Sequence, residues 1–140
     1  VIPLLVTFIP MLTDTGGNAG SQSSTMIIRG MAVGEIEAGD ILRVIWKELR
    51  VGVIVGVLLG LVNYIQLLIR FPGQEMLCLT VVLSLLATVM LAKTIGCVLP
   101  IVAQVLHLDP AIMAAPLITT IVDAVSLIIY FQLACSLLKI

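Results

Sequence analysis

Two sets of polar side chains recur at helical spacing inside a chain that is otherwise strongly apolar. One set lies in the tract TDTGGNAGSQSST, residues 13–25, and the other in residues 119–130. The members of each set follow the spacing i, i+4, i+7, i+11, which places them on one face of a helix. They are Asp14, Asn18, Ser21 and Thr25, and then Thr119, Asp123, Ser126 and Tyr130. Carboxylate, amide and hydroxyl oxygens suit hard cations, so the two stripes predict a site for Mg²⁺ or Ca²⁺.

The composition predicts which elements carry these stripes. Of the 140 residues, 61% are hydrophobic and only 11% are charged, whereas soluble domains carry about 25% charged residues. A membrane span needs about 20 apolar residues, and four segments qualify, at about 2–28, 51–69, 76–100 and 110–138. We therefore predict an all-α, polytopic helical bundle that forms one transmembrane domain over residues 1–140. The net charge of −1 gives no indication of a nucleic-acid partner. Because the chain starts at Val1 inside an apolar run, we expect it to be part of a longer protein.

Asp14 and Asp123 each fall near the middle of a predicted span. An ionised carboxylate there costs at least about 2.5–3.5 kcal/mol unless it meets water, a cation or a proton. Lys93 is the only basic residue well inside an apolar run. Two acids and one base leave a negative charge, and a bound divalent cation would neutralise it.

Charge also predicts the topology. The connection GMAVGEIEAGDILRVIWKELR, residues 30–50, interleaves apolar and charged residues at helical spacing. This pattern fits an amphipathic helix at the membrane interface and equally a solvated elbow. Arg29, Arg43, Lys47 and Arg50 gather around it. The positive-inside rule therefore places this elbow in the cytoplasm of a multi-pass plasma-membrane protein.

Glycine marks two places where helices can approach closely. Gly52, Gly56 and Gly60 repeat every four residues in the second span, a spacing typical of helix packing in lipid. The run GGNAG, residues 16–20, combines such a packing face with a weakened helix, whose backbone carbonyls could turn toward an ion pathway.

The segments TGGNAGSQSSTMIIRG (15–30) and LDPAIMAAPLITTIVDAVSLIIYFQLA (108–134) resemble the second and fifth transmembrane helices of MgtE-type magnesium transporters. The stretch GEIEAGDILRVIWKELRVG (34–52) resembles the elbow of the same family, so the resemblance covers essentially the whole chain. It implies Mg²⁺ transport by a homodimer, with the ion path on the two-fold axis between the first and last spans of each subunit.

The resemblance also implies roles for individual residues. Asp123 would be the main acidic contact of a hydrated Mg²⁺, with Gly17, Asn18 and Gly20 along the pore. At Ala115 some members carry a polar Asn, and Asp14 could supply compensating charge. The remaining pore-lining positions would be Ser21, Thr25, Thr119 and Ser126. Mg²⁺ enters as the transported ion, and a cytoplasmic Mg²⁺-sensing region is expected upstream, outside this chain.

Three other functions are compatible with some of these features. The same oxygen ligands would accept Mn²⁺, Co²⁺ or Ca²⁺. An intramembrane aspartyl protease would also place two aspartates on two helices, but its YD and GxGD motifs do not occur around Asp14 and Asp123. A purely structural subunit would gain little, because an interhelical polar contact contributes only about 0.6 kcal/mol. We therefore expect a transporter and not an enzyme.

Overall fold

The computed structural model describes residues 2–113 and 115–139, and every regular element in this part is helical, as the sequence predicts. The long helices are α2 (Ile9–Ala32), α3 (Ile41–Arg70), α4 (Glu75–Val105) and α5 (Ala115–Leu138). The short elements are α1 (Ile2–Thr7) and the two 3₁₀ turns η1 (Ala38–Asp40) and η2 (Pro110–Met113).

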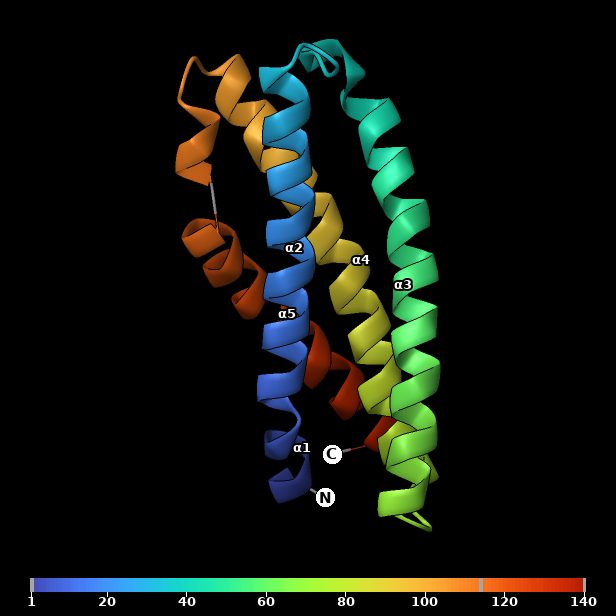
Figure 1. The fold of residues 1–140 in the computed structure, drawn as a ribbon. Coiled ribbons are helices and arrows are strands. Elements are labelled where there is room, and N and C mark those ends of the chain that lie inside the picture. The colour runs from blue at the N-terminus through green and yellow to red at the C-terminus, as the bar shows by residue number, and fades with distance from the viewer. Residues whose placement is uncertain (1, 114, 140) are drawn as a thin grey trace.

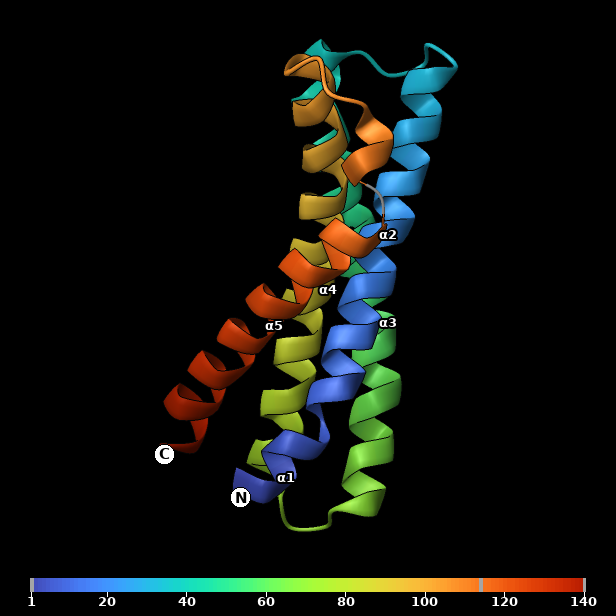
Figure 2. The ribbon, with the colours of Figure 1, turned by 90° about the vertical axis from the view of Figure 1, so that its left-hand side faces the viewer.

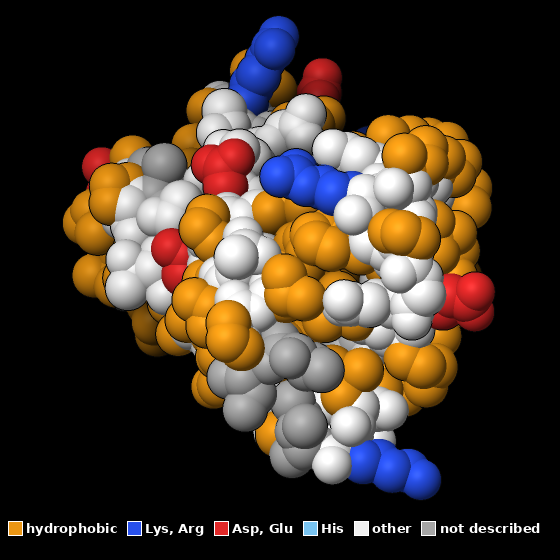
Figure 3. All heavy atoms as spheres, turned by 90° about the horizontal axis from the view of Figure 1, so that it is seen from below, with side chains coloured by type: hydrophobic (Ala, Val, Ile, Leu, Met, Phe, Trp, Pro, Cys, Tyr) orange, Lys and Arg blue, Asp and Glu red, His pale blue; other side chains and the backbone are white. Residues whose placement is uncertain are grey.

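Helix α4 is the centre of the bundle, because it packs against α2, α3 and α5. In Figure 1 it runs obliquely behind α2 from the upper left and approaches α3 at the lower right, with its middle part between the two. Helix α5 begins part-way along the bundle, crosses α2 and α4, and leans away from them toward the C-terminus (Figure 2). Both termini lie at the same end, where hydrophobic side chains cover much of the surface between a few charged ones (Figure 3).

The helix ends follow from local sequence. Pro10 has no backbone N–H to donate, and the helix is interrupted at Phe8, between α1 and α2. Helix α2 ends in a Schellman motif, in which Gly34 adopts φ +76° and the Glu35 amide donates to the Gly30 carbonyl at 2.9 Å. Helix α4 ends in the same motif with His107 at φ +56°.

Three helices are long and apolar enough to cross a membrane: Ala38–Arg70, Glu75–Val105 and Pro116–Leu138. This finding covers the described residues only. Helix α2 has 24 residues, or about 36 Å at 1.5 Å per residue, so its length suffices for a fourth span. The polar tract 13–25 lowers its hydropathy, and the predicted count of four spans stays a prediction.

The elbow predicted at 30–50 differs from the structure in one respect. Only residues 33–40 form a connection, and from Ile41 onward the chain continues as α3 without a break. The physical reason is that residues 41–51 contain neither Pro nor Gly, so nothing in them ends a helix. The predicted second span, 51–69, is therefore the later part of one helix of 30 residues.

Glycine sets the distances between the helices. Gly52, Gly56 and Gly60 of α3 face α4, where added Cβ atoms would meet Met90, Leu86 and Val82. This confirms the predicted packing role of the glycine repeat. Gly96 of α4 packs directly on the backbone of Gly20 in α2, so that an added Cβ would overlap the Gly20 carbonyl oxygen.

Substituting Gly96 with Ala should therefore separate α2 from α4. Overpacking a tight contact costs about 1–3 kcal/mol, which outweighs the gain of about 1 kcal/mol from replacing a helical glycine. We expect a lower thermal unfolding midpoint in mild detergent. The matched control is Gly39→Ala, because an added Cβ there has no neighbour within 4 Å. An unchanged midpoint for Gly96→Ala would contradict the contact.

Candidate functional site

An open groove of about 360 Å³ runs between α2 and α5. Its walls hold Asp14 and Asp123, together with an amide and two hydroxyls. The lining residues are Pro10, Thr13, Asp14, Gly17, Asn18, Thr119 and Asp123. The structure thus brings together five of the residues singled out from the sequence: Asp14, Gly17, Asn18, Thr119 and Asp123.

Gly17 allows α5 to approach α2 at the groove. A Cβ on Gly17 would lie 3.1 Å from Thr119 Cγ2 and 3.8 Å from Asp123 Oδ1. A larger side chain would therefore fill the space in front of the Asp123 carboxylate. Thr119 donates its hydroxyl proton to the carbonyl of Pro116 at 3.0 Å, which leaves the lone pairs of its Oγ1 available to accept.

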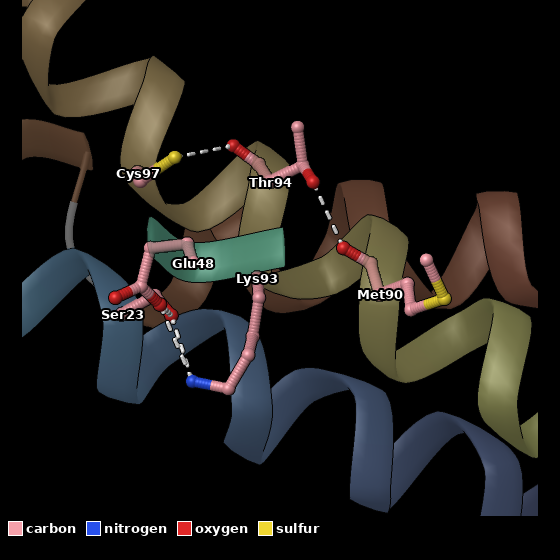
Figure 4. A network of polar contacts seen from close by, with 6 residues as sticks. All are labelled: Ser23, Glu48, Met90, Lys93, Thr94 and Cys97. Carbon is pink, nitrogen blue, oxygen red and sulfur yellow. Dashed lines mark hydrogen bonds and ion pairs between the residues drawn. The ribbon is translucent and has the colours of Figure 1, made fainter. Parts of the chain in front are cut away.

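The groove carboxylates have no cationic partner among the residues that the structure describes. Lys93, the one buried basic side chain among the described residues, binds to other residues. Its Nζ lies 3.3 Å from Glu48 Oε2 and 3.2 Å from Ser23 Oγ, and Ser23 donates to Glu48 Oε2 at 2.5 Å. Figure 4 shows the three side chains converging from α2, α3 and α4. The negative charge of Asp14 and Asp123 is thus open to a cation from outside the chain.

The other predicted residues lie outside this groove. Gly20 and Ser126 are buried between helices, and the Ser126 hydroxyl donates to the Val122 carbonyl at 2.6 Å. Thr25 is exposed and donates to the Ser21 carbonyl at 2.9 Å. The Ser21 hydroxyl oxygen is shielded and has no hydrogen-bond partner in the described part of the chain. The side chain of Ala115 lies outside the described residues.

Sequence reasoning missed the role of Glu48, which it assigned to a charged elbow at the interface. In the structure, Glu48 is buried with only 5% of its surface exposed. A signal was present in the spacing, because Glu48 stands four residues before Gly52 and so shares the face of the glycine repeat. A carboxylate on a packing face has to find a partner on the opposing helix.

Comparison with known proteins decides the family. The model of the MgtE family, described as a divalent cation transporter, matches residues 9–133. The chain belongs to the MgtE family. The matched range includes the whole groove between α2 and α5, as well as Ser23, Glu48 and Lys93.

Individual MgtE proteins are similar over nearly the whole chain. The magnesium transporter MgtE of Thermus thermophilus is 35% identical over 138 residues, or 99% of this chain and 30% of the relative. That of Bacillus subtilis is 36% identical over 130 residues, or 93% of this chain and 29% of the relative. That of Enterococcus faecalis is 29% identical over 136 residues, or 97% of this chain and 30% of the relative. The chain therefore spans about 30% of the length of these relatives.

Membership of the MgtE family confirms two expectations from the sequence. The chain is part of a membrane protein of an ion-transport family, which the apolar helices already indicate. The family is one of divalent cation transporters and not of enzymes, as expected from the sequence. The intramembrane protease alternative is thereby set aside.

Proposed function

We propose that this chain forms the membrane part of a Mg²⁺ transporter and that the groove between α2 and α5 is one wall of the ion pathway. The observation that carries the proposal is the pair of carboxylates in the groove, which no cationic side chain of the described residues neutralises. A charged acidic side chain inside the membrane has a high free energy unless it faces water or a cation. A pathway for a hydrated divalent cation satisfies both conditions.

The size of the groove supports recognition of the ion with its water shell. A water molecule occupies about 30 Å³ in the liquid, so the groove of about 360 Å³ has room for a hexahydrated ion. Mg²⁺ loses its water reluctantly and holds its inner ligands in near-octahedral geometry at about 2.0–2.1 Å. Asp14, Asn18 and Asp123 would then bind the waters of the ion through hydrogen bonds.

A second copy of the chain would complete the pathway. The groove between α2 and α5 is open on one side. A single chain therefore supplies only one wall of the proposed ion pathway. In a homodimer with the axis at this opening, each subunit would contribute Asp123 from the opposite side. Four carboxylates and two amides would then surround the passing ion.

This arrangement requires α2 to cross the membrane with α3, α4 and α5. Packing of α2 along α4 and its length of 24 residues support the crossing, and the groove would shelter its polar tract from lipid. The end of the bundle where α2 leads into α3 carries the basic residues Arg29, Arg43 and Lys47. By the positive-inside rule, they support a cytoplasmic position for this end in a plasma-membrane protein. The greater length of the relatives leaves room for a cytoplasmic regulatory region.

Flux measurements test the proposal. The purified protein, reconstituted into liposomes that contain a Mg²⁺-sensitive dye, should admit Mg²⁺ faster than empty liposomes. Competition by Mn²⁺, Co²⁺ and Ca²⁺ then ranks the ions that share the pathway. Flux of another divalent cation without flux of Mg²⁺ would make that ion the substrate, and absence of any divalent flux would contradict the proposal.

A further inference from the structure

A second groove, of about 530 Å³, lies at the opposite end of the bundle from the termini, where α2 ends and α3 begins. It combines charged and apolar side chains from both helices and from the connection between them. Its lining residues are Met26, Ile27, Arg29, Gly30, Val33, Glu35, Ile36, Asp40, Arg43, Val44, Lys47 and Glu48. We refer to it as the basic groove.

Three basic side chains of this groove are exposed and make no ion pair in the described part of the chain: Arg29, Arg43 and Lys47. Of the three acids that line the groove, one is neutralised by a cation. Glu48 is paired with Lys93 at 3.3 Å, whereas Asp40 Oδ2 accepts only the neutral Glu37 amide at 3.1 Å, which does not remove its formal charge. Three cations thus face two acids, Glu35 and Asp40, so the lining keeps a surplus of one positive charge.

The length of α3 fixes the depth of the groove in the membrane. Its 30 residues extend about 45 Å, whereas the hydrocarbon core is about 30 Å thick. The uncharged run 51–69 fills the hydrocarbon, so residues 41–50 project beyond it. Trp46, which is 62% exposed, is typical of the membrane–water interface. Arg43 and Lys47 therefore lie at the level of the lipid headgroups.

Exposed apolar side chains line the same groove. Met26 is 58% exposed and Val33 is 61% exposed. A small soluble anion bound to the basic residues would leave these apolar side chains in contact with water. A phospholipid can cover such side chains with its glycerol and upper acyl chain while its phosphate meets the basic residues. Basic pockets between membrane helices recognise anionic headgroups in this way.

We propose that the basic groove binds the headgroup phosphate of an anionic phospholipid, with Arg29, Arg43 and Lys47 as the contacts. This site is separate from the groove that holds Asp14 and Asp123. Its occupancy joins the end of α2 to the start of α3, and so should stabilise the bundle.

Thermal unfolding in detergent tests the proposal with three additives: phosphatidylglycerol, phosphatidylcholine and inorganic phosphate. We expect phosphatidylglycerol to raise the unfolding midpoint more than the other two. Arg43→Gln should weaken the apparent affinity about fivefold, and the triple variant R29Q/R43Q/K47Q about a hundredfold. Since the three side chains are exposed, the triple variant should still fold, which its unfolding without lipid checks.

Arg70→Gln is the matched control, because Arg70 is an exposed arginine at the other end of the same helix. It should leave the response to phosphatidylglycerol unchanged. Equal stabilisation by phosphatidylglycerol and phosphatidylcholine would overturn the proposal. So would an equal response of the wild type and the triple variant. Equal protection by inorganic phosphate would overturn the lipid assignment and identify a soluble anion as the occupant.

Discussion

Substituting Asp123 with Asn should remove most of the Mg²⁺ uptake at low external Mg²⁺. The change keeps the size of the side chain but removes one carboxylate from the groove between α2 and α5. A hydrogen bond to a charged group contributes about 1.5–3 kcal/mol, which corresponds to a loss of about 10- to 100-fold in apparent affinity for the hydrated ion. Uptake by reconstituted protein over a range of Mg²⁺ concentrations measures this loss.

Asp109→Asn is the control for this substitution. Asp109 is exposed, lies outside the groove, and accepts the Ala111 amide through Oδ1 at 2.9 Å. Asn can replace Asp in such a local contact, so uptake should stay at the wild-type rate. Wild-type uptake by Asp123→Asn would refute the proposed pathway. If Asp14→Asn reduced uptake more than Asp123→Asn, the main acidic contact would be on α2 instead of α5.

Much of this groove was predictable from the sequence. The spacing of Asp14 and Asn18 places them on one face of a helix, and Thr119 and Asp123 share a face in the same way. Exposing two polar stripes to lipid is energetically unfavourable. The simplest way to avoid this is for the two stripes to face each other. The structure does bring these four residues to one groove.

The extent of each stripe was not predictable, because it depends on where neighbouring helices cross. Ser126 and Tyr130 continue the stripe of Asp123 along α5, yet both are buried. The Tyr130 hydroxyl donates to the Leu5 carbonyl of α1 at 2.8 Å, and Ser126 packs against Gly16 of α2. Helical spacing determines which residues share a face, whereas the crossing angle determines how much of that face stays open.

The start of α3 was difficult to predict for a different reason. Charged residues at 43–50 resemble a separate amphipathic helix, and hydropathy alone places the start of the span at Val51. The absence of Pro and Gly from 41–51 was the signal for one continuous helix. Hydropathy marks where a helix meets the hydrocarbon, and helix-breaking residues mark where it ends.

The contact between Glu48 and Lys93 leads to the second large effect, on stability. Both side chains are at least 93% buried, since their exposed fractions are 7% and 5%. In Lys93→Met, the buried Glu48 carboxylate keeps the Ser23 hydroxyl as a donor but loses its cation, which is unfavourable. Removing one member of a buried ion pair costs about 3–5 kcal/mol. We expect a loss of this size in the free energy of unfolding, measured by denaturation in mixed detergent micelles.

The double variant Glu48→Met with Lys93→Met separates pairing from packing. Two apolar side chains of similar length bury no charge, and such replacements of ion pairs are often neutral or stabilising. With Glu48→Met as the other single variant, the three form a thermodynamic cycle, and the double variant should be more stable than either single variant. Lys47→Met is the control, because Lys47 is exposed next to Glu48 and should change stability by no more than about 0.5 kcal/mol. If the losses in the double variant simply added, the contact would be a consequence of packing and not a coupled pair.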